Sequence, residues 1–164
     1  MTDFHQEGLV TTLHALYQAV DEGGDYLESL ERKLEDHSRH QRIGLLLPSL
    51  YSEIENTEVL GRIIACIGQV RYLHGIVIAL GGTSDEGEFQ RAKEYFEPLR
   101  TPNRDVKVVW VEGPRIRAVF DRIQEKEIPT GVKGKGQSVW ITLGYMFARE
   151  DFDVISLHDC DIIS

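Results

Sequence analysis

Two aspartates, Asp159 and Asp161, have the residue type and the spacing of a metal site. They follow an apolar run over residues 154–157 and stand one residue apart. A buried strand ending there would place both at the carboxyl edge of a sheet, where open α/β sheets bind ligands. Side chains at i and i+2 of an extended chain face the same way, so both carboxylates can converge on a hard cation such as Mg²⁺ or Mn²⁺. Such a cation can neutralise a diphosphate and help it to leave.

A loop over residues 131–136 carries two lysines, Lys133 and Lys135, among glycines. It precedes an amphipathic pattern, and a lysine beside the N–H groups of a helix amino terminus suits a diphosphate. It is not a Walker loop, because Pro129 and Gly136 stand where that motif has a glycine and a serine or threonine. A solvated basic loop is the alternative, but a basic cluster in a chain of net charge −9 favours ligand binding.

Two further loops follow predicted strands. In residues 48–53 the backbone and Glu53 could accept hydrogen bonds from a base or a ribose. Taken alone, that loop is better explained as a strand-to-helix turn with an acidic first helical turn. Gly81 and Gly82 permit close approach of the backbone to a ligand. Residues 83–86 have the form of a capping box, so a tight turn with a helix cap is an equally good interpretation.

The elements that must position these loops alternate along the chain. Short apolar runs predict strands over residues 43–47, 76–80, 106–111 and 154–157. Amphipathic patterns between them predict helices, and Pro48 is expected to end the first strand. This alternation is typical of an α/β fold with a mostly parallel sheet flanked by helices. Residues 1–40 predict a separate helical segment of two amphipathic helices, and residues 41–164 the sheet domain.

Bulk composition narrows the class of protein. A chain of 164 residues with 41% apolar residues can build one globular domain. The net charge of −9 argues against a general nucleic-acid or anionic-membrane binder. Cys66 and Cys160 lack metal-type spacing and indicate a reducing compartment. The sequence has no signal-like amino terminus and no apolar run that could span a bilayer, so we expect a cytoplasmic protein.

Three motifs together resemble the nucleotide-binding half of a GT-A glycosyltransferase. They are the Leu-Leu-Pro-Ser-Leu-Tyr-Ser-Glu segment over 46–53, the Gly-Lys-Gly-Gln-Ser-Val-Trp segment over 134–140, and Asp-Cys-Asp over 159–161. The closest resemblance is to the glucosyl-3-phosphoglycerate synthase family, which comprises retaining enzymes that use a nucleotide-diphosphate sugar and Mg²⁺ or Mn²⁺. The resemblance covers the chain from about residue 43 and implies a Rossmann-like sheet.

The resemblance also implies a role for each matching residue. It implies that the sugar nucleotide is contacted by Pro48, Ser49, Leu50, Glu53, Gly81, Lys135 and Asp159. It implies that Asp159 and Asp161 bind the metal and that Lys135 and Asp161 act in catalysis as the leaving group departs. The family has an aspartate followed by Ser-Gly-Ser-Thr after its second strand, where this chain has Leu80-Gly-Gly-Thr83, so uridine is preferred while guanosine and adenosine stay open.

In the family an acceptor-binding half follows the Asp-x-Asp motif, whereas the printed sequence ends at Ser164. We therefore expect the donor-binding part of an enzyme that moves a hexose, with UDP-glucose preferred as donor, to 3-phosphoglycerate or a similar small acceptor. We expect this part, truncated after Asp161, to be inactive alone and to associate with the missing half or with another copy, because a cut sheet exposes an unpaired edge. The alternatives are a GT-A glycosyltransferase with another acceptor, and a non-catalytic nucleotide-binding or assembly module.

Overall fold

The computed structural model describes residues 25–55 and 57–160 of the chain. The helix expected over residues 8–20 and the aspartate at 161 lie outside the described residues. The chain divides into two compact units, residues 1–37 and 38–164. The first unit contributes α2 (Asp25–Ser38), which confirms the second amphipathic helix expected from the sequence.

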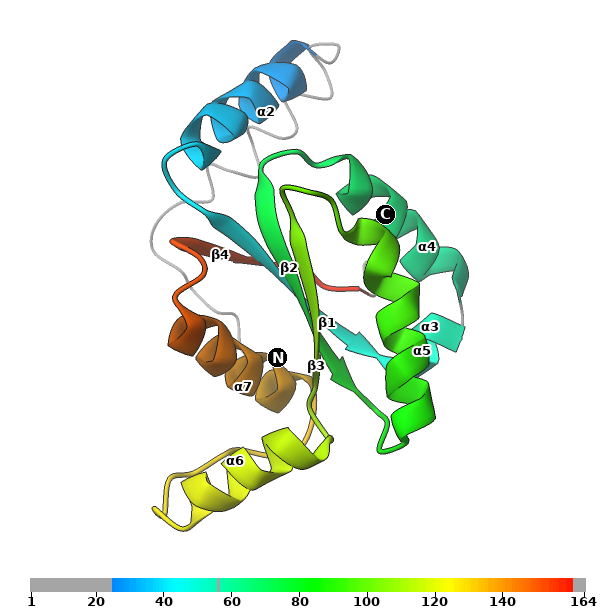
Figure 1. Ribbon diagram of the computed structural model, residues 1–164, viewed down its shortest axis with the longest axis vertical. Helices are drawn as coiled ribbons and strands as arrows, with labels where there is room; N and C mark the ends of the chain where they lie inside the picture. Colours follow the sequence, from blue (N-terminus) through cyan, green and yellow to red (C-terminus); the bar gives the residue numbers. More distant parts are fainter. Residues whose placement is uncertain (1–24, 56, 161–164) are drawn as a thin grey trace, which may run out of the picture. The chain divides into compact units, whose positions relative to one another are not determined.

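The second unit is built on a sheet of four parallel strands in the order β3-β2-β1-β4 (Figure 1). The strands are β1 (Ile43–Leu50), β2 (Leu73–Gly81), β3 (Asp105–Trp110) and β4 (Val154–Leu157). Leu46 in β1 pairs with Val77 in β2 on one side and with Leu157 in β4 on the other. Parallel pairing and the helices between the strands confirm the predicted α/β class and are consistent with a Rossmann-like GT-A half.

Helices cover both faces of this sheet. One face carries α3 (Tyr51–Glu55), α4 (Thr57–Gln69), α5 (Glu86–Phe96) and a 3₁₀ turn (Glu97–Leu99). The other carries α6 (Pro114–Gln124) and α7 (Lys135–Arg149), which lie apart from the first group in Figure 1. Alternate residues of β1 feed the two cores, since Leu45 and Leu47 pack on the α4 side and Leu46 on the α7 side. The two central strands, β1 and β2, are therefore buried on both faces, as their continuous hydrophobic runs predict.

The first strand continues through Pro48, so the prediction that this proline ends it is wrong: β1 ends at Leu50. The N–H of His158 donates to the Leu46 carbonyl at 3.1 Å, so the backbone groups of Leu46, and by alternation those of Pro48, face β4. The ladder with β4 ends at the pair of Leu46 and Leu157. The absence of an N–H at Pro48 therefore costs the sheet no hydrogen bond.

The last strand is exposed, which corrects the expectation of a buried strand before the aspartates. Leu157 is 59% exposed, and Val154 is also exposed. Among the described strands, β4 pairs with β1 alone and lies at the sheet edge. Only Ile155 packs against the core on the α7 side. The apolar run thus marks an edge strand in which Ile155 is the side chain that packs against the core.

The cap of α5 lies two residues later than the predicted capping box. Asp85 is the N-cap residue, and its Oδ1 accepts a hydrogen bond from the Glu88 N–H at 2.8 Å. The Thr83 hydroxyl bonds to the Glu88 carboxylate and also accepts the Asp85 N–H at 3.0 Å. Two overlapping residue patterns compete here, and the aspartate prevails because its carboxylate is the stronger acceptor for orphan N–H groups.

A buried arginine joins α4 to the loop before β3. Arg104 is only 4% exposed. Its guanidinium donates to the backbone carbonyls of Leu99, Ile67, Val70 and Gly68. Three of these belong to the carboxyl end of α4 and the residues around it, where carbonyls lack helical partners and a cation is favourable. Burial lowers the pKa of Arg104 from its ordinary value.

At the amino end of β1, Arg42 and Asp153 tie the strand to β4. The Asp153 carboxylate accepts the backbone N–H of Arg42 at 2.7 Å and its Nε at 3.3 Å, while the Arg42 carbonyl accepts the Asp153 N–H at 2.9 Å. These bonds from the Arg42 side chain and backbone lower the pKa of Asp153 below its ordinary value. The contacts set the register in which Ile43 pairs with Val154.

We expect Arg104→Ala to lower the free energy of unfolding by about 3 kcal/mol, because several buried carbonyls lose a charged donor. Urea denaturation followed by tryptophan fluorescence measures this change. The matched control is Arg62→Ala, since Arg62 is exposed and pairs with Glu58 one helical turn away; it should change stability by less than about 1 kcal/mol. Equal effects of the two variants would contradict the role given to Arg104.

We expect Asp153→Asn to destabilise the chain at pH 7 but not at strongly acidic pH. Because the folded-state pKa of Asp153 is lowered, its stabilising contribution is present above the unfolded pKa of about 3.9 and is lost as pH falls through the folded pKa. The difference in urea midpoint between the two proteins should therefore shrink from pH 7 towards pH 3. A difference that stays constant over this range would show that the carboxylate charge is not involved.

Candidate functional site

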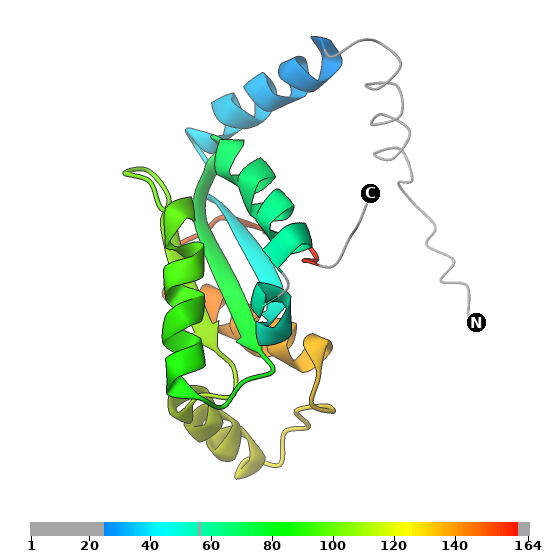
Figure 2. The same cartoon turned by 90° about the vertical axis from the view of Figure 1, so that its right-hand side faces the viewer.

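Lys135 and Asp159 lie together at the carboxyl edge of the sheet. They are 24 residues apart in sequence, and Lys135 Nζ forms an ion pair with Asp159 Oδ1. Asp159 follows β4, and Lys135 opens α7, whose amino end lies next to the carboxyl ends of β1 and β2 (Figure 2). The structure thus places the predicted lysine and the first aspartate of the pair on one rim, and Asp161 lies outside the described residues.

Lys135 belongs to a helix rather than to the preceding loop, which corrects the predicted loop boundary. Gly134 is the N-cap residue, and its carbonyl accepts the Ser138 N–H at 3.0 Å. A β-carbon at Gly134 or Gly136 would meet no atom within 4 Å, so open space surrounds this end of the helix. The first N–H groups of a 15-residue helix and its dipole favour an anion there.

A cavity of about 490 Å³ adjoins the ion pair; we call it the aspartate cavity. It is lined by Pro48, Lys135, Gly136, Val139, Leu157, His158 and Asp159. Of the predicted site residues, Pro48, Lys135 and Asp159 therefore share one cavity. His158 was expected to point away from the aspartates, yet it contributes to the same wall.

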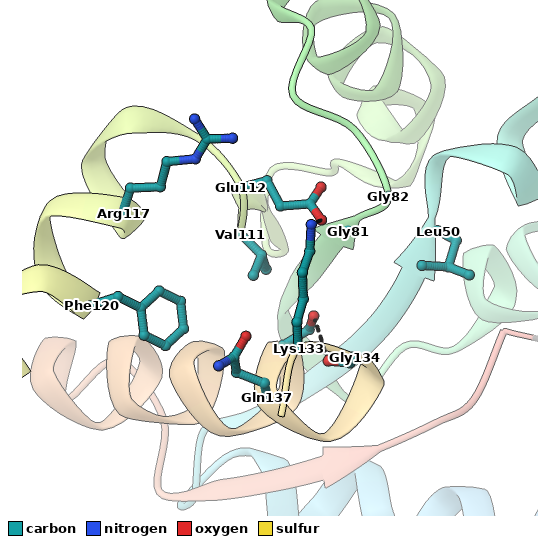
Figure 3. A pocket seen from close by; sticks show the side chains of 11 residues that line it. Leu50, Gly81, Gly82, Val111, Glu112, Arg117, Phe120, Lys133, Gly134 and Gln137 are labelled. Atoms are coloured by element: carbon teal, nitrogen blue, oxygen red, sulfur yellow. Dashed lines mark hydrogen bonds and ion pairs between the residues drawn. The ribbon is translucent and has the colours of Figure 1, made fainter. Parts of the chain in front are cut away.

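A second cavity, of about 540 Å³, lies on the other side of the first turn of α7; we call it the glycine cavity (Figure 3). Its walls come from the ends of β1, β2 and β3, from α6, and from α7. It is lined by Leu50, Gly81, Gly82, Val111, Glu112, Arg117, Phe120, Lys133, Gly134, Gln137 and Ser138. Two predicted site residues, Leu50 and Gly81, open into it.

Ser49 and Glu53 form the turn from β1 into α3. Ser49 is buried, and its hydroxyl donates to Glu53 Oε2 at 2.9 Å. The Leu50 N–H donates to the same oxygen at 3.0 Å. These bonds are the ones expected of the strand-to-helix turn, in which an acidic side chain caps the helix start. Contact of Ser49 and Glu53 with a nucleotide stays a prediction.

The glycine pair after β2 serves a turn and also opens a cavity. Gly82 has φ of +78°, a left-handed conformation that favours glycine. The loop that follows is fixed from β3, because Trp110 Nε1 donates to the Thr83 carbonyl at 2.8 Å. It is also fixed from α6, where Arg117 donates to the Ser84 hydroxyl at 2.9 Å. The turn with a helix cap is therefore confirmed, and close approach of a ligand to the two glycines stays a prediction.

Sequence reasoning missed Glu112, which lies two residues after the end of β3. Its Oε1 pairs with Lys133 Nζ at 2.8 Å, and its Oε2 is buried without a hydrogen-bond partner among the described residues. Attention to the end of every predicted strand could have found it, since all carboxyl ends of a parallel sheet meet at one edge. The loop lysine Lys133 was noticed, but its partner was not.

The described donor set fits a cation shared with a ligand. No cluster of three or more metal-ligating side chains occurs within residues 25–55 and 57–160. Mg²⁺ is usually held by one or two carboxylates together with substrate phosphates and water, and Asp159 can supply one of them. The site therefore suits a metal bound together with a diphosphate.

None of the described helices is long and apolar enough to cross a bilayer.

Comparison with known proteins agrees with these motifs. No protein-family model matches the chain, and no solved structure matches it significantly. The chain is 38% identical over 164 residues to glucosyl-3-phosphoglycerate synthase of Persephonella marina, and 35% identical over 163 residues to that of Methanococcoides burtonii. It spans 38% and 37% of the lengths of these relatives. Along its whole length the chain is therefore similar to part of glucosyl-3-phosphoglycerate synthases, which confirms the resemblance drawn from its motifs.

Proposed function

We propose that the chain binds the donor of a cytoplasmic, metal-dependent, retaining glycosyltransferase. The donor is a nucleotide-diphosphate hexose, with glucose as the preferred sugar, and the acceptor is 3-phosphoglycerate or a similar small molecule. The similarity to two glucosyl-3-phosphoglycerate synthases supports the reaction class. The observation that carries the proposal is the meeting of Lys135 with Asp159 at the sheet's carboxyl edge.

Two cavities flank the first turn of α7, and this layout suits an elongated ligand. Gly134 and Ser138 line the glycine cavity, whereas Lys135 and Gly136 line the aspartate cavity. We place the nucleoside in the glycine cavity, the diphosphate over the helix amino terminus and the sugar towards the aspartate cavity. The outward N–H groups of the helix and the Lys135 ammonium would hold the phosphate charge.

Lys135 and Asp159 have complementary tasks in this proposal. Asp159, with Asp161, would hold Mg²⁺ or Mn²⁺, which when bound neutralises the diphosphate. The ion pair holds the Lys135 ammonium beside the Asp159 carboxylate. The lysine stem is flexible, so its ammonium can turn from the carboxylate to a phosphate oxygen and stabilise the charge that develops as the sugar leaves.

Replacement of Asp159 by asparagine should remove the metal dependence of nucleotide binding. We expect Mn²⁺ to strengthen the binding of UDP, GDP or ADP to the unaltered chain, and Asp159→Asn to reduce that gain by about 10- to 100-fold, because the amide is a neutral and weaker ligand. Titration calorimetry with and without Mn²⁺ measures it, with Asp121→Asn on the exposed face of α6 as control. An absence of heat with all three nucleotides would favour the non-catalytic alternative.

Replacement of Lys135 by methionine tests the phosphate contact separately. Loss of one charged hydrogen-bond donor should weaken diphosphate binding by about 10- to 100-fold and should weaken nucleoside binding much less. The matched control is Lys126→Met, an exposed lysine after α6. If Lys135→Met bound the diphosphate as tightly as the unaltered chain, the lysine would have only a structural role.

A further inference from the structure

The strand β3 lies at one edge of the sheet and pairs with β2 on one side only, among the described strands. The Val111 N–H donates to the Leu80 carbonyl of β2 at 2.9 Å. Because the backbone groups of successive residues in a strand face opposite neighbours, those of Val106, Val108 and Trp110 face away from β2. This side of β3 is therefore the free edge of the sheet.

The chain itself caps both ends of this free edge. At the amino end, Arg100 donates to the Val106 carbonyl at 2.6 Å, and the Val106 N–H donates to the Asp105 carboxylate at 2.9 Å. At the carboxyl end, the Trp110 carbonyl accepts a backbone N–H from the turn after β3, at 3.0 Å. The N–H and carbonyl of Val108 and the N–H of Trp110 stay open between the caps. A short extended segment of another chain can pair with these groups.

A groove of about 630 Å³ includes Val108 and Trp110 in its lining; we call it the edge groove. In Figure 1, α5 lies on one side of β3, and α6 and α7 lie on the other. Phe89 of α5 stacks on Trp110 with ring centroids 4.9 Å apart, and Val119 of α6 adds apolar surface opposite. The edge groove shares no lining residue with the glycine cavity or the aspartate cavity.

The charged side chains of the edge groove favour an acidic ligand. Lys93 of α5 holds its ammonium 5.7 Å from the centre of the Phe89 ring, and Arg115 lines the groove from α6. Glu86 is the acidic residue of the lining, so two basic side chains face one acidic side chain. This basic excess occurs in a chain whose net charge is −9. A second copy paired through the same edge would bring the same basic excess against it, which is unfavourable.

We propose that the edge groove binds an extended segment of a partner protein, rich in β-branched residues and carboxylates. The backbone of the segment pairs with Val108 and Trp110 as an added strand. Its side chains alternate between the two walls. Those on one side pack on Phe89 and approach Lys93, and those on the other approach Arg115. Donor binding uses none of these residues, so the inference is independent of the proposed function.

The first arm of the test uses the 164-residue chain and a fluorescent, end-blocked peptide, Ser-Glu-Val-Val-Val-Glu-Ser, called the Glu peptide. Its sequence reads the same in both directions, so it suits parallel and antiparallel pairing. The Lys peptide has lysines in place of both glutamates, and a third peptide has N-methyl groups on its three valines. By fluorescence anisotropy, we expect both controls to bind at least about 10-fold more weakly, through charge repulsion and loss of backbone bonds.

The second arm locates the bound peptide by hydrogen exchange. Binding of the Glu peptide should slow exchange of the Val108 and Trp110 amides and should leave those of Ile155 and Leu157, in the other edge strand, unchanged. Val108→Pro removes an N–H that faces away from β2, so the sheet keeps its bonds. Circular dichroism checks that this variant folds, and it should bind the Glu peptide at least about 10-fold more weakly.

The third arm exchanges the charges of the groove. The double variant Lys93→Glu and Arg115→Glu should bind the Lys peptide more tightly than the Glu peptide, which reverses the preference of the unaltered chain. A merely structural role of the two cations would lower the affinity for both peptides together. Lys126→Glu, at an exposed lysine after α6, is the matched control and should leave the preference unchanged.

Protection of Val108 and Trp110 together with a charge preference that the double variant reverses supports the proposal. It is overturned if the Glu peptide does not bind the folded chain, if it binds without protecting these amides, or if the Lys peptide or the N-methylated peptide binds equally well. Should Val108→Pro fail to fold, hydrogen exchange and the N-methylated peptide still decide. None of these outcomes changes the test of donor binding, because the edge groove and the donor site share no residue.

Discussion

Parallel pairing of all four strands is the constraint on which the rest of the second unit depends. It places every strand's carboxyl end on the same edge, so loops far apart in sequence meet there. Leu50, Gly81, Glu112 and Asp159 each end or closely follow a different strand, and α7 brings Lys135 to the same edge. The candidate site is therefore formed by several loops, which the parallel sheet brings together at one edge.

The two edges of the sheet use their charged side chains differently. At the amino edge, Arg42 pairs with Asp153, and Lys107 pairs with Asp105 and Asp151, at 3.0 Å and 3.2 Å. Hydrogen bonds from Arg149 and then from Lys107 lower the pKa of Asp151 below its ordinary value. At the carboxyl edge, Glu112 keeps a buried oxygen without a partner among the described residues.

The sequence predicted the strands and the rim well because continuous apolar runs identify parallel strands buried on both faces. It placed the end of β1 at Pro48, whereas the strand ends at Leu50. The proline is tolerated because β4 no longer pairs with β1 at that point, which the local sequence does not reveal. It misplaced the α5 cap, because residues 83–88 contain two competing capping patterns. It missed Glu112, because a single acid after a strand is unremarkable until the fold buries it beside Lys133.

The central claim is that a sugar nucleotide lies across the first turn of α7, between the glycine cavity and the aspartate cavity. A crystal structure of the chain with a nucleoside diphosphate and Mn²⁺ tests it most directly. The account predicts the base in the glycine cavity, the diphosphate at Lys135, and an anomalous Mn²⁺ peak at about 2 Å from an Asp159 oxygen. A nucleotide bound elsewhere, such as the cavity of about 630 Å³ lined by Phe89 and Trp110 between α5 and α6, would contradict it.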